Sequence, residues 1–181
     1  MGTYNYISII AVFCYVFMML TFLAAKKNKL VNSFLILLLG LIFWTGGSVF
    51  MRMELWPSYV FWFQVSLCGL FILPYAYGRF INAFAGRKDT LFDTVYLLVM
   101  LLCFAVNIPS GIFLKFPRLV EKDGVTSFVY DMDWKVSVFF VVAAVVLLHI
   151  FIGIVEACRA NRNMRKQVEP IVLGMLMLFL G

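Results

Sequence analysis

Apolar residues occur along the chain in long runs, separated by short clusters of charged and turn-forming residues. Runs of about 20 apolar residues are long enough to cross the roughly 30 Å hydrocarbon core of a bilayer as helices. We therefore predict transmembrane helices at about residues 6–25, 30–51, 57–78, 90–107 and 134–155, with a sixth at 170–181. Pro170 suits the first turn of that sixth helix, and Pro109-Ser110-Gly111 is expected to break the fourth.

The sixth run ends with the chain at Gly181. At 1.5 Å per residue it covers only about 18 Å of a core that is roughly 30 Å thick. A helix that stopped there would leave carbonyl groups without partners in hydrocarbon. We therefore expect a single transmembrane domain over residues 1–181 that is C-terminally truncated within or near its sixth helix.

Strand character is found between the fourth and fifth runs, in a loop at about residues 110–132. Asp123-Gly124 separates two stretches with β-branched and aromatic residues, which is a hairpin signal. The predicted fold is an all-α integral membrane helical bundle, with five full transmembrane helices plus a truncated sixth. A small extracytoplasmic β-hairpin between helices 4 and 5 is expected to lie over the outer mouth of the bundle.

The composition argues against a soluble domain. Hydrophobic residues make up 64% of the chain and charged residues 13%, and the mean hydropathy is +1.00. A soluble domain is about half apolar and about a quarter charged. No positive residue precedes the first apolar run, so we interpret that run as a retained helix rather than a signal peptide. The spacing of the four cysteines fits neither a metal site nor a disulfide framework, and we expect no cofactor and no catalysis in this chain.

The net charge of +6 comes from short basic clusters, which mark topology better than they indicate binding to nucleic acid. By the positive-inside rule, connectors one, three and five are cytoplasmic, and the N-terminus and the hairpin lie outside. The expected location is a bacterial cytoplasmic membrane, crossed several times. The residues that determine this topology are Lys26, Lys27, Lys29, Arg87, Lys88, Arg159, Arg162, Arg165 and Lys166.

Aromatic and amide side chains in the predicted outer half could line a cavity for a small, partly apolar ligand. The candidates are Trp44, Trp62, Gln64, Asn107, Phe128 and Tyr130. Hydrogen bonds between helices are an alternative explanation for Gln64 and Asn107. Trp62 also fits an interfacial aromatic belt.

Few ionisable residues lie within the predicted helices. His149, in the fifth, is either functional or hydrogen-bonded to a neighbouring helix. Asp93 is expected to interact favourably with the dipole of the fourth helix. Glu156 is expected to pair with Arg159 or Arg79. The small residues Gly40, Gly46, Gly47 and Ser48 predict close packing of the second helix against a neighbour.

Several positions together resemble a known family. They are Asn32-Ser33-Phe34 with Trp44, then Trp62-Phe63-Gln64 with Gly69, Pro74 and Phe80, and finally Arg165-Lys166-Gln167 with Gly174. With the outer hairpin, this pattern resembles the N-terminal seven-transmembrane sensor region of bacterial histidine kinases, which also occurs on some diguanylate cyclases.

The resemblance implies a membrane-embedded signal-sensing input domain. A small-molecule or peptide signal would repack the helices, and the bundle would pass that change to a missing cytoplasmic output domain with kinase or cyclase activity. Such outputs usually work in pairs, which implies a homodimer. The alternatives are a small membrane transporter or channel, or a structural membrane subunit. A transporter should show repeated halves, broken helices or charges at the midplane, and the sequence shows one lone histidine and no repeat.

Overall fold

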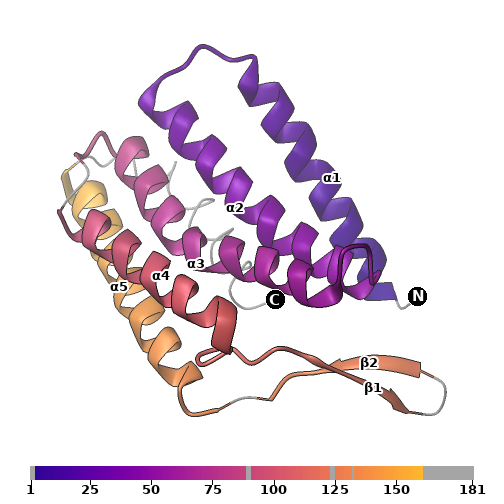
Figure 1. Cartoon of the computed structure of the whole chain (residues 1–181). Coiled ribbons are helices and arrows are strands. Elements are labelled where there is room, and N and C mark those ends of the chain that lie inside the picture. The colour runs from indigo at the N-terminus through magenta and orange to yellow at the C-terminus, as the bar shows by residue number, and fades with distance from the viewer. Residues whose placement is uncertain (1–2, 89–90, 123–124, 132, 161–181) are drawn as a thin grey trace.

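The computed structural model describes residues 3–88, 91–122, 125–131 and 133–160 (Figure 1). The element order is α1 (Thr3–Leu23), α2 (Lys29–Arg52), α3 (Tyr59–Phe84), α4 (Leu91–Ser110), β1 (Arg118–Lys122), β2 (Val125–Val129) and α5 (Val136–Ala160). All five helices are long and apolar enough to cross a membrane, which confirms the predicted multi-pass helical fold. The sixth helix expected at 170–181 lies outside the described residues.

Side-chain caps and turn residues place the helix ends differently from the sequence-based expectation. The third helix begins at Tyr59 rather than Pro57, because the Ser58 side chain accepts a hydrogen bond from the Phe61 N–H and caps it. The fourth helix ends at Ser110 rather than at residue 107, within the expected break at Pro109-Ser110-Gly111. Gly111, at φ +56°, then donates its N–H to the Asn107 carbonyl at 2.8 Å and ends the helix.

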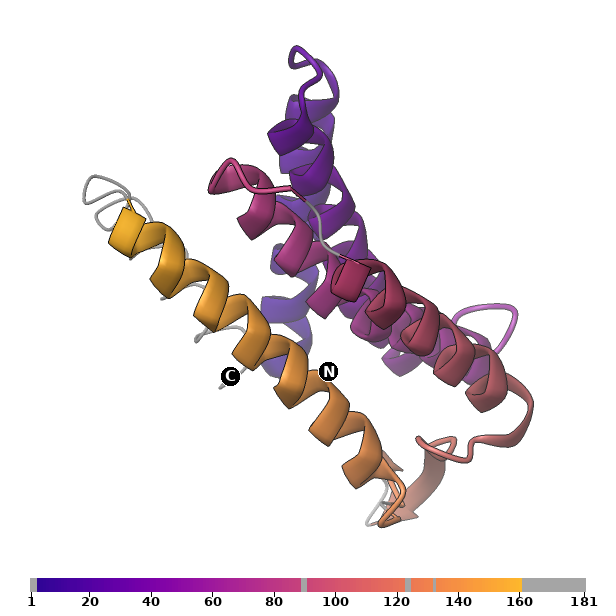
Figure 2. The ribbon, with the colours of Figure 1, turned by 90° about the vertical axis from the view of Figure 1, so that its left-hand side faces the viewer.

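Helix α3 is the centre of the bundle. It packs against α2 on one side and against α4 and α5 on the other, while α1 packs against α2 at the periphery (Figures 1 and 2). Figure 1 shows that α3 changes direction partway along its length. Pro74 lies inside α3, where it removes one intrahelical donor, a common cause of such a bend. A change in the position of α3 therefore affects three neighbouring helices.

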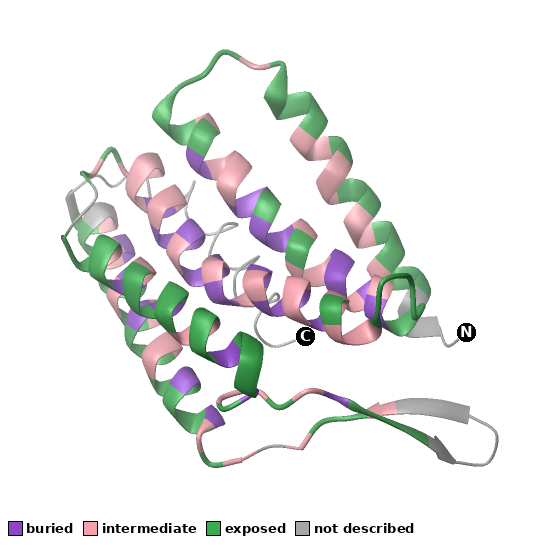
Figure 3. Cartoon of the chain, viewed as in Figure 1, coloured by how far each residue is buried: buried purple, intermediate pink, exposed green. Residues whose placement is uncertain are grey.

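Figure 3 shows buried positions where helices face one another and exposed positions on their outer faces. Many of the exposed residues are large and apolar. Leu38, Phe71 and Met100 are at most 2% exposed and represent α2, α3 and α4 in the core. No residue of the span Tyr6–Leu23 in α1 is buried within the described part of the protein. An apolar exterior of this kind is stable in lipid, where it faces hydrocarbon rather than water.

The loop between α4 and α5 contains two paired strands. β1 and β2 are antiparallel, with Arg118 opposite Val129 and Lys122 opposite Val125. They follow the strand pattern expected around Asp123-Gly124, whose own placement lies outside the described residues. Figure 1 shows the pair crossing the end of the bundle below α3, and Phe128 contacts Tyr59 with ring centroids 5.8 Å apart. That this hairpin lies outside the cytoplasm stays a prediction.

The first and third connectors, which carry basic clusters, meet at one end of the bundle. Lys29 Nζ donates to the Arg87 carbonyl at 3.1 Å, which joins the start of α2 to the segment after α3. Figure 1 shows the end of α5 at this same end, and the α2–α3 loop and the hairpin at the other. The first and third connectors and the end of α5 therefore lie at one end, as an antiparallel bundle requires. The positive-inside rule predicts that this end faces the cytoplasm.

Candidate functional site

A cavity of about 200 Å³ lies between α2, α3 and the loop on either side of the hairpin. Two of the predicted ligand-binding residues line it, Trp44 from α2 and Tyr130 from the end of the hairpin. We call it the Trp44 cavity. Its lining residues are Trp44, Ser48, Met51, Phe63, Ser66, Leu67, Leu70, Leu114, Lys115, Tyr130, Asp131 and Val136. This combination of an apolar wall with a few polar groups is typical of small-molecule sites.

Two serine hydroxyl groups belong to the polar part of the cavity wall, together with Lys115, Tyr130 and Asp131. Ser66 Oγ donates to the Trp44 carbonyl at 2.8 Å, and the Ser48 and Ser66 Oγ atoms are 2.9 Å apart. Since a hydroxyl has one proton, Ser48 must then donate to Ser66. The lone pairs of Ser48 remain to accept a hydrogen bond from a bound molecule.

Glycines bring α2 and α3 into backbone contact beside the cavity. A Cβ on Gly47 would lie 2.8 Å from both the Ser66 Cα and the Trp62 carbonyl oxygen. A Cβ on Gly69 would overlap the backbone of Trp44 and lie 2.6 Å from the Gly40 oxygen. The predicted close packing of the second helix is therefore confirmed, except that a Cβ on Gly46 would meet nothing within 4 Å. These contacts fix the position of Trp44 relative to α3.

The structure places three other predicted site residues in contacts between elements. Trp62 Nε1 donates to the carbonyls of Leu55 and Trp56, both at 3.2 Å, and so holds the α2–α3 loop. Gln64 Nε2 donates to the Ile108 carbonyl at 3.1 Å and joins α3 to α4. Phe128 packs on Tyr59. None of the three is among the described residues that line the Trp44 cavity.

Asn107 supports the cavity from behind. It is 1% exposed, and its Oδ1 accepts from the N–H groups of Phe113 and Leu114, each at 2.9 Å. Its Nδ2 donates to the Leu114 carbonyl at 3.3 Å. Asn107 therefore fixes the loop whose Leu114 and Lys115 line the cavity, and it has no direct place in the lining.

An outer pocket of about 500 Å³ adjoins the Trp44 cavity and shares Lys115 and Asp131 with it. Its other described lining residues are Tyr59, Ser110, Gly111, Ile112, Phe116, Pro117, Arg118, Asp133 and Lys135. Two ion pairs cross this loop region, Lys115–Asp133 at 3.8 Å and Arg118–Asp131 at 3.0 Å.

The phenol of Tyr130 lies at the junction of the hairpin and the helices. Its ring is 6.2 Å from that of Phe63. Partial burial raises the pKa of this phenol above its ordinary value, and the charge of Arg52 offsets part of the rise. Tyr130 is therefore protonated at neutral pH and offers a hydroxyl, not a charge, to the cavity.

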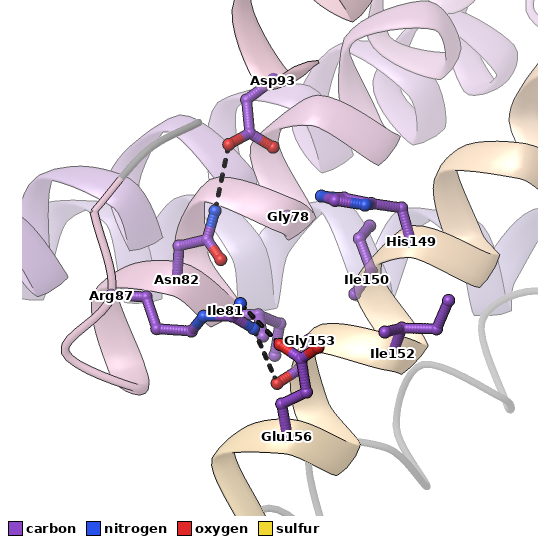
Figure 4. Close-up of a pocket in the computed structure, with 10 residues that line it drawn as sticks. All are labelled: Gly78, Ile81, Asn82, Arg87, Asp93, His149, Ile150, Ile152, Gly153 and Glu156. Carbon is purple, nitrogen blue, oxygen red and sulfur yellow. Dashed lines mark hydrogen bonds and ion pairs between the residues drawn. The ribbon is translucent and has the colours of Figure 1, made fainter. Parts of the chain in front are cut away.

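A second polar cluster lies at the opposite end of the bundle, between α3, α4 and α5 (Figure 4). Arg87 Nη2 lies 2.8 Å from Glu156 Oε2, and Arg87 Nη1 donates to the Gly153 carbonyl at 2.9 Å. The expectation that Glu156 pairs with Arg159 or Arg79 is therefore wrong, because the fold brings the α3–α4 connector closer. Asn82 Nδ2 donates to Asp93 Oδ2 at 3.2 Å, so Asp93 has a side-chain partner beyond the helix dipole.

His149 lines the same pocket of about 130 Å³. Its ring packs on that of Phe92, with centroids 4.3 Å apart, and so joins α5 to the first turn of α4. From the sequence, we expect no titratable side chain near His149 in the membrane. The structure instead places Asp93, Arg87 and Glu156 around the same pocket. Sequence reasoning missed this cluster because its members are far apart in the chain.

Of the residues predicted to set topology, the exposed ones are Lys26, Lys27, Lys29, Lys88 and Arg159. Arg162, Arg165 and Lys166 lie outside the described residues. The exposed cations lie at the ends of apolar helices, where they can reach lipid head groups and water.

Comparison with models of known protein families gives a match over most of the chain. The model of the family described as the N-terminal 7TM region of histidine kinase matches residues 7–181. Among curated proteins and among solved structures, no match is found.

Proposed function

The chain belongs to the family of N-terminal seven-transmembrane regions of histidine kinases, and from this premise we propose that it senses a ligand in the Trp44 cavity and passes the signal through α3. The match supports a kinase as the output and gives no support to the diguanylate cyclase alternative. Kinase chemistry would then belong to a cytoplasmic domain that follows this region.

The observation that carries the proposal is the Trp44 cavity itself. It has a mainly apolar and aromatic lining, a few polar groups and a volume of about 200 Å³. Its walls come from α2, α3, the loop around the hairpin and the start of α5. A molecule bound there would contact all of these elements at once, so its affinity would depend on how they are packed.

A ligand shifts a conformational equilibrium only by its difference in affinity between two states. Here the element that would differ is α3, which contacts α2, α4 and α5. At the other end, Gly78 of α3 lies against Ile150, and Arg87 binds Gly153 and Glu156 of α5. A shift of α3 caused at the cavity would therefore change the contacts that hold α5.

The proposal includes an orientation and an assembly. The charge pattern supports a bacterial cytoplasmic membrane location, with the N-terminus, the cavity and the hairpin on the outer side. Lys29 and Arg87, from two of the charged connectors, lie together at one end of the bundle, as this assignment requires. A homodimer is proposed because histidine kinase outputs work in pairs.

The test measures basal autophosphorylation of the intact kinase in native membrane vesicles. Trp44→Ala enlarges the cavity and Leu70→Phe fills it, so each should change basal autophosphorylation several-fold by favouring one packing. Phe43→Ala is the matched control, because Phe43 precedes Trp44 and is 37% exposed on the outside of α2. If both cavity variants insert and fold normally but phosphorylate at the parent rate, the proposed function is wrong.

A further inference from the structure

The two adjoining spaces at the outer end of the bundle differ in chemical character. The Trp44 cavity is bounded mainly by apolar and aromatic side chains, whereas charged side chains from the loop ring the outer pocket. Lys115 and Asp131 line both, so the two spaces are neighbours around these residues. A molecule long enough to occupy both would need an apolar part and a polar part.

The size of the Trp44 cavity limits the apolar part of a molecule that could bind there. An apolar cavity of about 150 Å³ is large enough to bind benzene. The Trp44 cavity, at about 200 Å³, therefore has room for one aromatic ring or an alkyl group of similar size. A longer chain would have to extend into the outer pocket.

The charged side chains of the outer pocket determine which polar group a bound molecule could place there. Its two carboxylates, Asp131 and Asp133, are each within an ion pair, with Arg118 and Lys115 respectively. Lys135 also lines the pocket and has no ion pair among the residues that the structure describes. It directly precedes α5, which begins at Val136 and whose N-terminal dipole adds partial positive charge. The net charge of the side chains that line the outer pocket is therefore positive and would attract an anion.

We propose that the ligand is an amphipathic molecule, with an apolar body in the Trp44 cavity and an acidic head group beside Lys135 in the outer pocket. This inference rests on the proposed function and adds the chemical class of its ligand. A carboxylate, sulfonate or phosphate head would satisfy the same charge.

The experiment uses the intact protein in nanodiscs of phosphatidylcholine and three probes with one body. They are para-fluorophenylpropionate, para-fluorophenylpropanol and para-fluorophenylpropylamine, and fluorine NMR measures the binding of each. The acid should bind most tightly and the amine most weakly. Lys135→Gln should weaken binding of the acid about tenfold, the equivalent of about 1.4 kcal/mol, to the level of the alcohol. Lys135→Arg should keep the preference for the acid over the alcohol and the amine. Lys88→Gln, at the other end of the bundle, should leave the affinities for all three probes unchanged.

Trp44→Ala should weaken all three probes alike, since they share one apolar body. Equal affinity for the acid and the alcohol, or failure of all three probes to bind, would overturn the inference about the ligand. Neither result would affect the autophosphorylation test of the Trp44 cavity, which uses no added probe. The two proposals can therefore fail separately.

Discussion

Arg87 Nη2 lies 2.8 Å from Glu156 Oε2, and this ion pair joins the connector after α3 to the last turns of α5. The two side chains are 38% and 58% exposed, so their pairing is worth at most about 1 kcal/mol. The second contact, from Arg87 Nη1 to the Gly153 carbonyl, fixes the direction of the guanidinium. The pair is therefore better suited to setting the position of α5 than to stabilising the whole fold.

Arg87→Gln should loosen the end of α5 while changing the free energy of unfolding by less than about 1 kcal/mol. Spin labels at positions 88 and 159 can report this by pulsed electron resonance, since both residues are exposed. We expect a broader distance distribution in the variant. Lys26→Gln, an exposed cation at the same end, is the control and should leave the distribution unchanged. An unchanged distribution in Arg87→Gln would show that other contacts hold α5.

Gly47→Ala and Gly69→Ala should each destabilise the bundle by about 1–3 kcal/mol or more, because the new methyl group would overlap the backbone of the facing helix. Gly46→Ala is the matched control, since a Cβ there meets nothing within 4 Å. It should be neutral or stabilising by the helix propensity of alanine. Thermal unfolding in detergent measures all three, and equal stability of the three variants would contradict the close contact of α2 with α3.

Asn107→Ala should cost about 1–3 kcal/mol, because it leaves the backbone N–H groups of Phe113 and Leu114 without their acceptor. Ser110→Ala provides a comparison in the same turn. Its exposed hydroxyl donates only to the carbonyl of Val106, one turn back, so its loss should have little effect. Unfolding midpoints that fall by the same amount in both variants would argue against a special role for Asn107.

Val129→Cys tests the predicted orientation, since Val129 lies at the end of β2 and is 43% exposed. In a background in which the four native cysteines are replaced, an impermeant thiol reagent should label this position in intact cells. Lys88→Cys, exposed at the opposite end, should be labelled only after the cells are opened. The reverse pattern would show that the charge rule assigns the wrong side.

The five helices were predictable because a span needs only a long apolar run, whatever its neighbours are. Helix ends were less predictable, because they depend on single contacts such as the Ser58 cap and the bond from Gly111 to Asn107. Trp44 and Tyr130 could be proposed as a site from their type and depth. That they share a cavity depends on the path of the hairpin.

The polar cluster around His149 contains contacts that the sequence alone does not predict. Arg87 and Glu156 are 69 positions apart in the chain, and their contact follows from how α3 and α5 pack. Charge spacing along one helix suggested Arg159 as the partner of Glu156. Which of several cations pairs with Glu156 depends on how the helices are arranged in space.

The peripheral position of α1 has a consequence for how the protein meets membranes of different thickness. No residue of its span Tyr6–Leu23 is buried in the described part of the protein, and this helix packs mainly against α2, so its tilt would disturb chiefly one neighbour. Tilting is one way in which a helix adjusts to a hydrocarbon layer that does not match its length, at fractions of a kcal/mol per Å. Hydrophobic mismatch should therefore be absorbed first at α1, leaving the packing of α2 against α3 unchanged.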